Sequence, residues 1–111
     1  MDHDLASGGA ALYESLSDPG DSAELSALIL EAARIKDRLD RLDRLISGEE
    51  ELWAYLVTAR GGDDTVLEVS INNAMTEARQ TATVFRQMLA EIARRRGQEG
   101  GTGEHDPLDD L

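Results

Sequence analysis

Apolar residues recur along the middle of the chain with the spacing of a heptad repeat. From Leu28 to Ile46 they are separated by four, three, four, three and four residues. Sustained over almost three repeats, this spacing predicts a long helix with an apolar seam that faces a partner. Asp18-Pro19-Gly20 breaks the chain before it, and Asp21 or Ser22 can then accept backbone N–H groups as the N-cap. The seam positions are Leu28, Ala32, Ile35, Leu39, Leu42 and Ile46.

A second apolar stripe fills the last third of the chain. Thr65–Ile71 alternates β-branched residues and so also fits a strand, but a lone strand would have no partner, and the helical stripe continues beyond it. We predict a helix from Thr65, the start of a capping box with Glu68, to Arg96, ended by Gly97. Between the two long helices, Ser47-Gly48 predicts the end of the first helix. We expect a short helix at 49–58 and the turn of the hairpin at 60–64. The stripe is Leu67, Ile71, Ala74, Ala78, Thr81 or Ala82, Phe85, Leu89 and Ile92.

The predicted fold is therefore all-α, a long helical hairpin in which two long helices are joined through a short one. We expect residues 1–20 to be a flexible acidic arm with a possible short helix, 21–96 the oligomerisation core, and 97–111 a disordered acidic tail. Apolar residues off the two stripes would leave a long exposed face, which predicts self-association, although a compact monomeric bundle is the alternative. The expected oligomerisation residues are Leu28, Ile35, Leu39, Leu42, Ile46, Ile71, Phe85, Leu89 and Ile92.

Charge is distributed unevenly along the chain. The formal net charge is -12, yet all 11 basic residues lie within 25–96, and both ends carry only acids. Basic residues on the first long helix, together with a cluster at 94–96, are candidate contacts to the DNA backbone. On the first long helix the alternating Asp residues favour a solvated helix, with the pairs Asp37–Arg41 and Asp40–Arg44, over DNA contact. At 94–96 the two interpretations are even, because cations also suit the last turn of a helix. The candidates are Arg34, Lys36, Arg38, Arg41, Arg44, Arg94, Arg95 and Arg96.

The chain offers no candidate active site. It has no Cys, its two histidines (His3 and His105) lie in the acidic ends, and no phosphate-binding loop is present. Gly61–Asp64 supplies too few ligands at defined spacing for a metal. We therefore expect no enzyme activity, cofactor or metal. No apolar run approaches the ~20 residues of a membrane span, and acid stands where a signal peptide carries Lys or Arg, so we expect a cytoplasmic protein without membrane contact.

The order of several short motifs resembles a known family. Gly9-x-x-Leu-Tyr-x-Ser-Leu16 precedes Glu31-Ala-Ala-Arg34 and Asp37-Arg-Leu-Asp-Arg-Leu42, and Leu52-Trp53 and Glu77-Ala-Arg-Gln80 follow. This order is similar to that of the small terminase subunit of actinobacterial phages. The resemblance covers about residues 9–96. It implies a non-enzymatic, ring-forming adaptor that engages viral double-stranded DNA, weakly and mainly through its backbone. The adaptor would also recruit or regulate the large terminase subunit, which holds the ATPase and nuclease.

The acidic tail and the rival functions complete the prediction. Leu108 and Leu111, flanked by acids, form a candidate segment that folds on binding the large subunit, and a solubilising tail is the alternative. A coiled-coil scaffold or secretion-type helical hairpin would bind protein only, but Trp53 is followed by Ala54-Tyr55 and not by the Trp-x-Gly of small secreted hairpins. An antitoxin-like regulatory dimer is a further possibility. Neighbouring genes would separate these functions.

Overall fold

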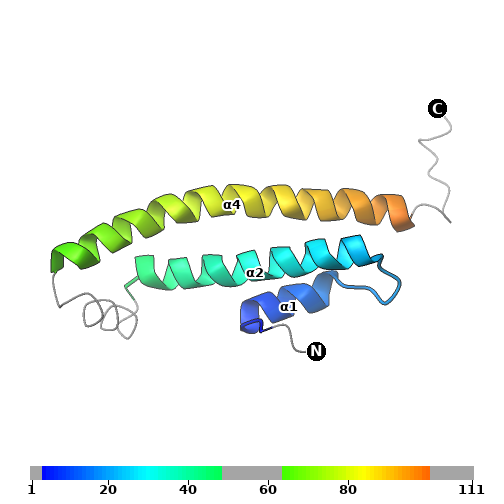
Figure 1. Cartoon of the computed structure of the whole chain (residues 1–111), viewed down its shortest axis with the longest axis horizontal. Coiled ribbons are helices and arrows are strands. Elements are labelled where there is room, and N and C mark those ends of the chain that lie inside the picture. Colours follow the sequence, from blue (N-terminus) through cyan, green and yellow to red (C-terminus); the bar gives the residue numbers. More distant parts are fainter. Residues whose placement is uncertain (1–3, 49–63, 101–111) are drawn as a thin grey trace.

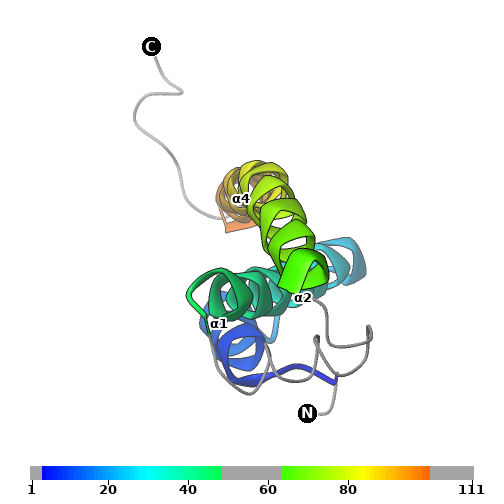
Figure 2. The ribbon, with the colours of Figure 1, turned by 90° about the vertical axis from the view of Figure 1, so that its left-hand side faces the viewer.

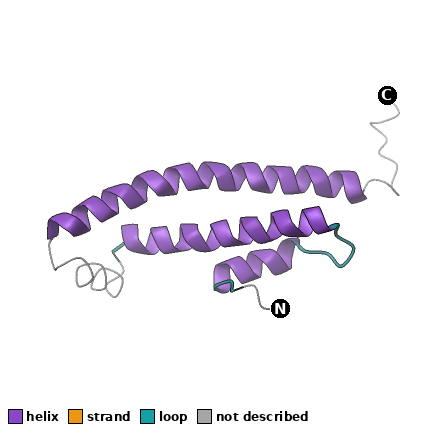
Figure 3. Ribbon diagram, viewed as in Figure 1, coloured by secondary structure: helices purple, strands orange, loops and turns teal. Residues whose placement is uncertain are grey.

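The computed structural model describes residues 4–48 and 64–100, and it contains three helices and no strand in this part of the chain. They are α1 (Ser7–Leu16), α2 (Ala23–Ile46) and α4 (Asp64–Gly100) (Figures 1 and 3). The two long helices pack against each other, which confirms the predicted all-α helical hairpin. The short helix predicted at 49–58 lies outside the described residues.

The helices are stacked with α2 in the middle. It packs against α1 on one side and against α4 on the other, and α1 and α4 approach each other only at the end where Arg96 of α4 donates to the carbonyl of Leu16 (Figures 1 and 2). α1 is the short helix that was expected as a possibility in the arm. It packs along α2 in this structure.

Both ends of α2 follow from local sequence. Ser22 is the N-cap, and its hydroxyl accepts a hydrogen bond from the backbone N–H of Leu25 at 3.1 Å. At the other end Ser47 is the C-cap, and Gly48 adopts a positive φ of 84°, which a residue without Cβ takes at little cost. The N–H of Gly48 then donates to the carbonyl of Leu45 at 3.3 Å. The predicted cap and stop are confirmed.

α4 differs from its prediction at its ends. Thr65–Ile71 is helical, as predicted, but the helix already includes Asp64, so Thr65 lies within its first turn and is not the N-cap. At the other end the helix continues through Gly97 to Gly100, so the prediction that Gly97 ends it was wrong. A single Gly costs a helix about 1 kcal/mol relative to Ala, which lowers stability without forcing a stop.

The core lies at one end of the hairpin, where all three helices meet. Leu25, Ile29 and Ala32 of α2 are fully buried against Ile92 of α4, and half-buried side chains surround them. Fully burying one Leu or Ile contributes about 1.5–3 kcal/mol. Leu25 and Ile29 were not part of the predicted seam. The surrounding side chains are Tyr13, Leu16, Leu28, Phe85 and Met88.

The other end of the hairpin is less well buried. There the structure buries only Ala74 among the described apolar side chains, and the predicted seam residues of α2 are half-exposed. Among the expected oligomerisation residues, Ile92 is buried within the chain, and Leu28 and Phe85 pack on its core. Apolar surface therefore remains available mainly at this end. The half-exposed oligomerisation residues are Ile35, Leu39, Leu42, Ile46, Ile71 and Leu89.

Candidate interaction surfaces of the hairpin

The carboxylate of Asp37 in α2 caps the first turn of α1. It accepts hydrogen bonds from the backbone N–H of Ala6, at 2.8 Å, and of Gly9, at 2.6 Å. Ala6 is the N-cap residue of α1 and has no side chain that could satisfy these groups itself. A negative charge at this position also complements the helix dipole. Asp37 is therefore engaged by α1, and not by Arg41 as the i,i+4 pattern predicted.

Two glycines let α1 approach α2 closely. A Cβ placed on Gly9 would lie 2.6 Å from the carbonyl oxygen of Ala33 and would also clash with the Asp37 carboxylate. A Cβ on Gly8 would meet the carboxylate of Asp40. Asp40 forms an ion pair with Lys36 at 2.5 Å, and this pair lies beside α1. It takes the place of the predicted pair between Asp40 and Arg44. Lys36 therefore lies beside α1 and apart from the arginines described next.

A groove runs along α2, and Glu77 of α4 forms part of its wall. Its volume is about 710 Å³, and its lining includes Arg34, Arg38 and Arg41 with the apolar side chains of Ile35, Leu42 and Leu45. We call it the arginine groove. Three of the five basic residues predicted on this helix meet here, because spacings of four and three residues place them on one face. Leu45, which adds to its apolar lining, was not among the predicted site residues.

Three carboxylates also line the arginine groove, and they differ in how firmly they hold its arginines. Glu77 of α4 pairs with Arg38 at 2.8 Å, and this contact lowers the pKa of Glu77. Glu31 stands 3.6 Å from Arg34, a loose pair, and Asp37 is turned to α1. Arg41 has no ion pair within the described residues. Exposed pairs of this kind contribute little to stability, so an incoming anion can displace them.

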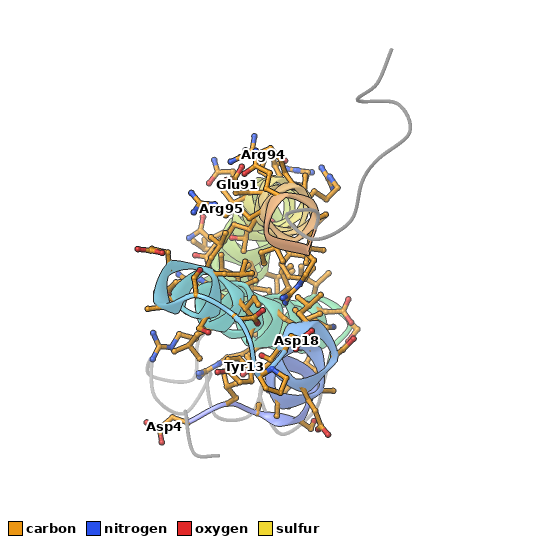
Figure 4. All side chains as sticks on the ribbon, turned by 90° about the vertical axis from the view of Figure 1, so that its right-hand side faces the viewer. Asp4, Tyr13, Asp18, Glu91, Arg94 and Arg95 are labelled. Carbon is orange, nitrogen blue, oxygen red and sulfur yellow. The ribbon has the colours of Figure 1, made fainter. Side chains whose placement is uncertain are left out.

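The arginine cluster at the end of α4 is held by carboxylates. Glu91 accepts from Arg94, at 3.0 and 2.5 Å, and from Arg95, at 2.6 Å. These hydrogen bonds from Arg94 and Arg95 lower the pKa of Glu91 to about 2. Figure 4 shows the three side chains together on α4, on the side of this helix that faces away from α1 and α2. Because Glu91 is the one carboxylate that pairs with Arg94 and Arg95 among the described residues, these two arginines carry one more positive charge than it neutralises.

Arg96 is a structural residue at the three-helix end. Its guanidinium forms a fork on the carboxylate of Asp21, one arm of which measures 3.1 Å, and it also donates to the carbonyl of Leu16. The side chain of Asp21 is only 3% exposed, and the bond from Arg96 lowers its pKa. Arg96 thus ties α4 to the end of α1 and to the turn before α2. Its guanidinium is engaged within the chain, and its predicted contact with DNA stays a prediction.

The remaining predictions fall in different places. Arg44 lies exposed in the last turn of α2. Leu108 and Leu111, expected to bind the large subunit, lie outside the described residues, as do both histidines. In the part of the chain that the structure describes, no three His, Asp or Glu side chains gather as metal ligands would, and no helix has the length and apolarity needed to cross a bilayer.

No protein-family model, curated protein or solved structure matches this chain. The resemblance to small terminase subunits therefore depends on the motif residues and on the contacts that these residues make in the structure.

Proposed function

We propose that this chain is a small-terminase-type adaptor, a non-catalytic protein that self-assembles through its hairpin, touches DNA through phosphates, and recruits or regulates a large ATPase and nuclease subunit. Its assembly would use the half-buried side chains at the open end of the hairpin. Its DNA contacts would come from the arginine groove, with Arg94 and Arg95 as a second patch.

The observation that carries the proposal is that the three main motifs behind the resemblance contact one another. Gly9 of the arm motif receives its cap from Asp37 of the α2 motif, and Arg38 of the same motif pairs with Glu77 of the α4 motif. Ala33 of the Glu-Ala-Ala-Arg stretch supplies the carbonyl that Gly9 approaches. Each motif alone consists of residues that are common in helices. Because these residues contact one another in the fold, their order along the chain supports the resemblance to the family.

The recruitment part of the proposal is tested through the neighbouring genes. If a large-terminase reading frame lies beside this one, its product should co-purify with this chain when the two are expressed together. A neighbouring toxin or secretion ATPase would contradict the proposal, and so would a co-expressed large subunit that fails to bind.

The DNA part is tested by fluorescence anisotropy with a labelled duplex of about 30 base pairs over a salt series. Phosphate contacts make the logarithm of affinity fall linearly with the logarithm of salt concentration. Arg41→Glu should weaken binding and reduce that slope by about one, whereas Arg79→Glu, on an exposed part of α4, should leave both unchanged. Equal effects of the two substitutions would contradict DNA contact at the groove.

A protein-only scaffold is the second candidate, and the carboxylate partners favour it. Glu31, Glu77, Glu91 and Asp21 already stand beside most of the predicted DNA-binding arginines. The same titration separates the two functions, because a scaffold that binds only protein would show no anisotropy change even at low salt.

A further inference from the structure

We propose that the arginine groove binds the acidic segment 101–111 of a second copy of this chain, so that copies are linked head to tail. This inference rests on the self-assembly in the proposed function and specifies one contact that would build the assembly. It also gives the groove an occupant when no DNA is bound.

Charge complementarity supports this occupant. Segment 101–111 contains Glu104, Asp106, Asp109 and Asp110 and no Lys or Arg. The groove offers three arginines beside three carboxylates, and one of these carboxylates, Asp37, is already bound to the backbone of α1. Of the arginines, Arg41 is unpaired within the described residues and Arg34 is only loosely paired. Acids arriving at the groove therefore displace at most two weak exposed pairs and gain partners for all three guanidinium groups.

The apolar positions match as well. Leu108 and Leu111 are three residues apart, with two acids between them, and the groove presents Leu42 and Leu45, also three residues apart, beside Arg41. Two leucines on a segment of this charge can lie against two leucines in the groove while the acids reach the arginines. The segment thus carries both kinds of contact that the groove offers, in compatible order.

Reach prevents the chain's own segment from placing both of its leucines against Leu42 and Leu45, although its acids could reach Arg34 at the near end of the groove. The contact between Arg96 and Asp21 places the end of α4 level with the start of α2. From Gly100 the path back to Leu45 is then about 42 Å, because it spans four residues of α4 and 24 of α2 at ~1.5 Å each. Leu111 lies eleven residues beyond Gly100 and extends at most about 36–40 Å, and Leu108 less. A neighbouring copy has no such restriction.

A head-to-tail contact has a consequence for assembly. It joins different surfaces on the two copies, and contacts of that type close into rings or extend into filaments. Two competitions would follow. DNA would compete with segment 101–111 for the arginines of the groove. The large subunit would compete with the groove for Leu108 and Leu111.

Charge reversal with rescue tests the contact by sedimentation velocity of the full chain at tens of micromolar. Arg41→Glu, and separately the pair Asp109→Lys and Asp110→Lys, should each weaken association about tenfold at ~0.1 M salt. All three changes in one chain should restore association, because the charges are then exchanged across the same contact. Arg79→Glu is the matched control, since it reverses an exposed arginine of α4 that lies outside the groove, and it should change association less than twofold.

Cysteine cross-linking tests the partners directly, because the natural chain has no Cys. Leu45→Cys chains mixed with Leu111→Cys chains should form mixed disulfide dimers on mild oxidation, and replacing the first with Gln87→Cys on the outer side of α4 should not. A double variant that closes on itself as a monomer would overturn the inference. Association that is unchanged by every charge reversal would overturn this inference alone. A chain that stays monomeric under all conditions would overturn both this inference and the proposed function.

Discussion

Removing the Asp37 carboxylate should loosen the packing of α1 on α2. In Asp37→Ala, the backbone N–H groups of Ala6 and Gly9 lose their acceptor. An N-cap contributes about 1 kcal/mol, and a negative charge at a helix N-terminus adds about 0.3–1 kcal/mol. We therefore expect the docking of α1 to be destabilised by about 1.5 kcal/mol, which corresponds to a roughly tenfold larger equilibrium constant for its opening.

The matched control for this change is Asp43→Ala. Both substitutions gain about 0.5 kcal/mol of helix propensity in α2, but Asp43 is exposed and caps nothing within the described residues, so the difference between the two variants isolates the cap. Hydrogen exchange of the α1 amides, measured by mass spectrometry, reports the opening. Equal α1 protection in the two variants would refute the idea that this carboxylate holds α1 in place.

Three further predictions follow from the end of α4. Gly97→Ala should raise the free energy of unfolding by about 0.5–1 kcal/mol in urea titrations, because the position is helical and a Cβ there meets nothing within 4 Å; a loss of stability would contradict the helix through this residue. Carboxyl NMR should place the pKa of Glu91 at about 2, and Arg94→Gln should raise it. The stabilisation from a lowered folded-state pKa is present above the unfolded value near 4.5 and is lost as pH falls towards 2, so a midpoint for Glu91 near 4.5 would contradict these ion pairs. Arg96→Lys should cost about 2 kcal/mol, since Lys cannot form the fork on Asp21, and unchanged stability in a thermal melt would show that the fork does not hold the helices together.

The elements of the fold were predictable because their signals are local. The heptad steps and the Ser22 cap need only neighbouring residues to act, and they gave the existence of α2 and its start. The buried set was harder to predict. Leu25 and Ile29 lie off the seam that begins at Leu28, and they are buried because α1 and α4 both cover α2 at this end and so widen its apolar face.

The candidate site was predictable in its residue types and not in their partners. Spacing alone placed Arg34, Arg38 and Arg41 on one face of a helix. The i,i+4 rule then assigned Asp37 to Arg41, but such a pair is worth only about 0.2–0.5 kcal/mol, less than a helix N-cap. When α1 brings unsatisfied backbone N–H groups to Asp37, the carboxylate binds them in place of Arg41, because a helix cap is the stronger interaction. Local sequence patterns do not predict this contact, since it joins two helices.

That competition shapes the surface that the chain presents. Because Asp37 faces α1, Arg41 is left without a carboxylate partner on its own helix, and the arginine groove is more open to an outside anion than the alternating Asp and Arg residues suggest. Anything that releases α1 would return Asp37 to Arg41 and reduce the positive charge of the groove. In the proposed function, the position of the arm and the binding of anions would therefore be coupled through one side chain. On this argument Asp37→Ala, which cannot compensate Arg41 in either state, should bind the DNA duplex at least as tightly as the natural chain even though its arm is loosened. Weaker binding by that variant would show that the docked arm itself contributes to the surface.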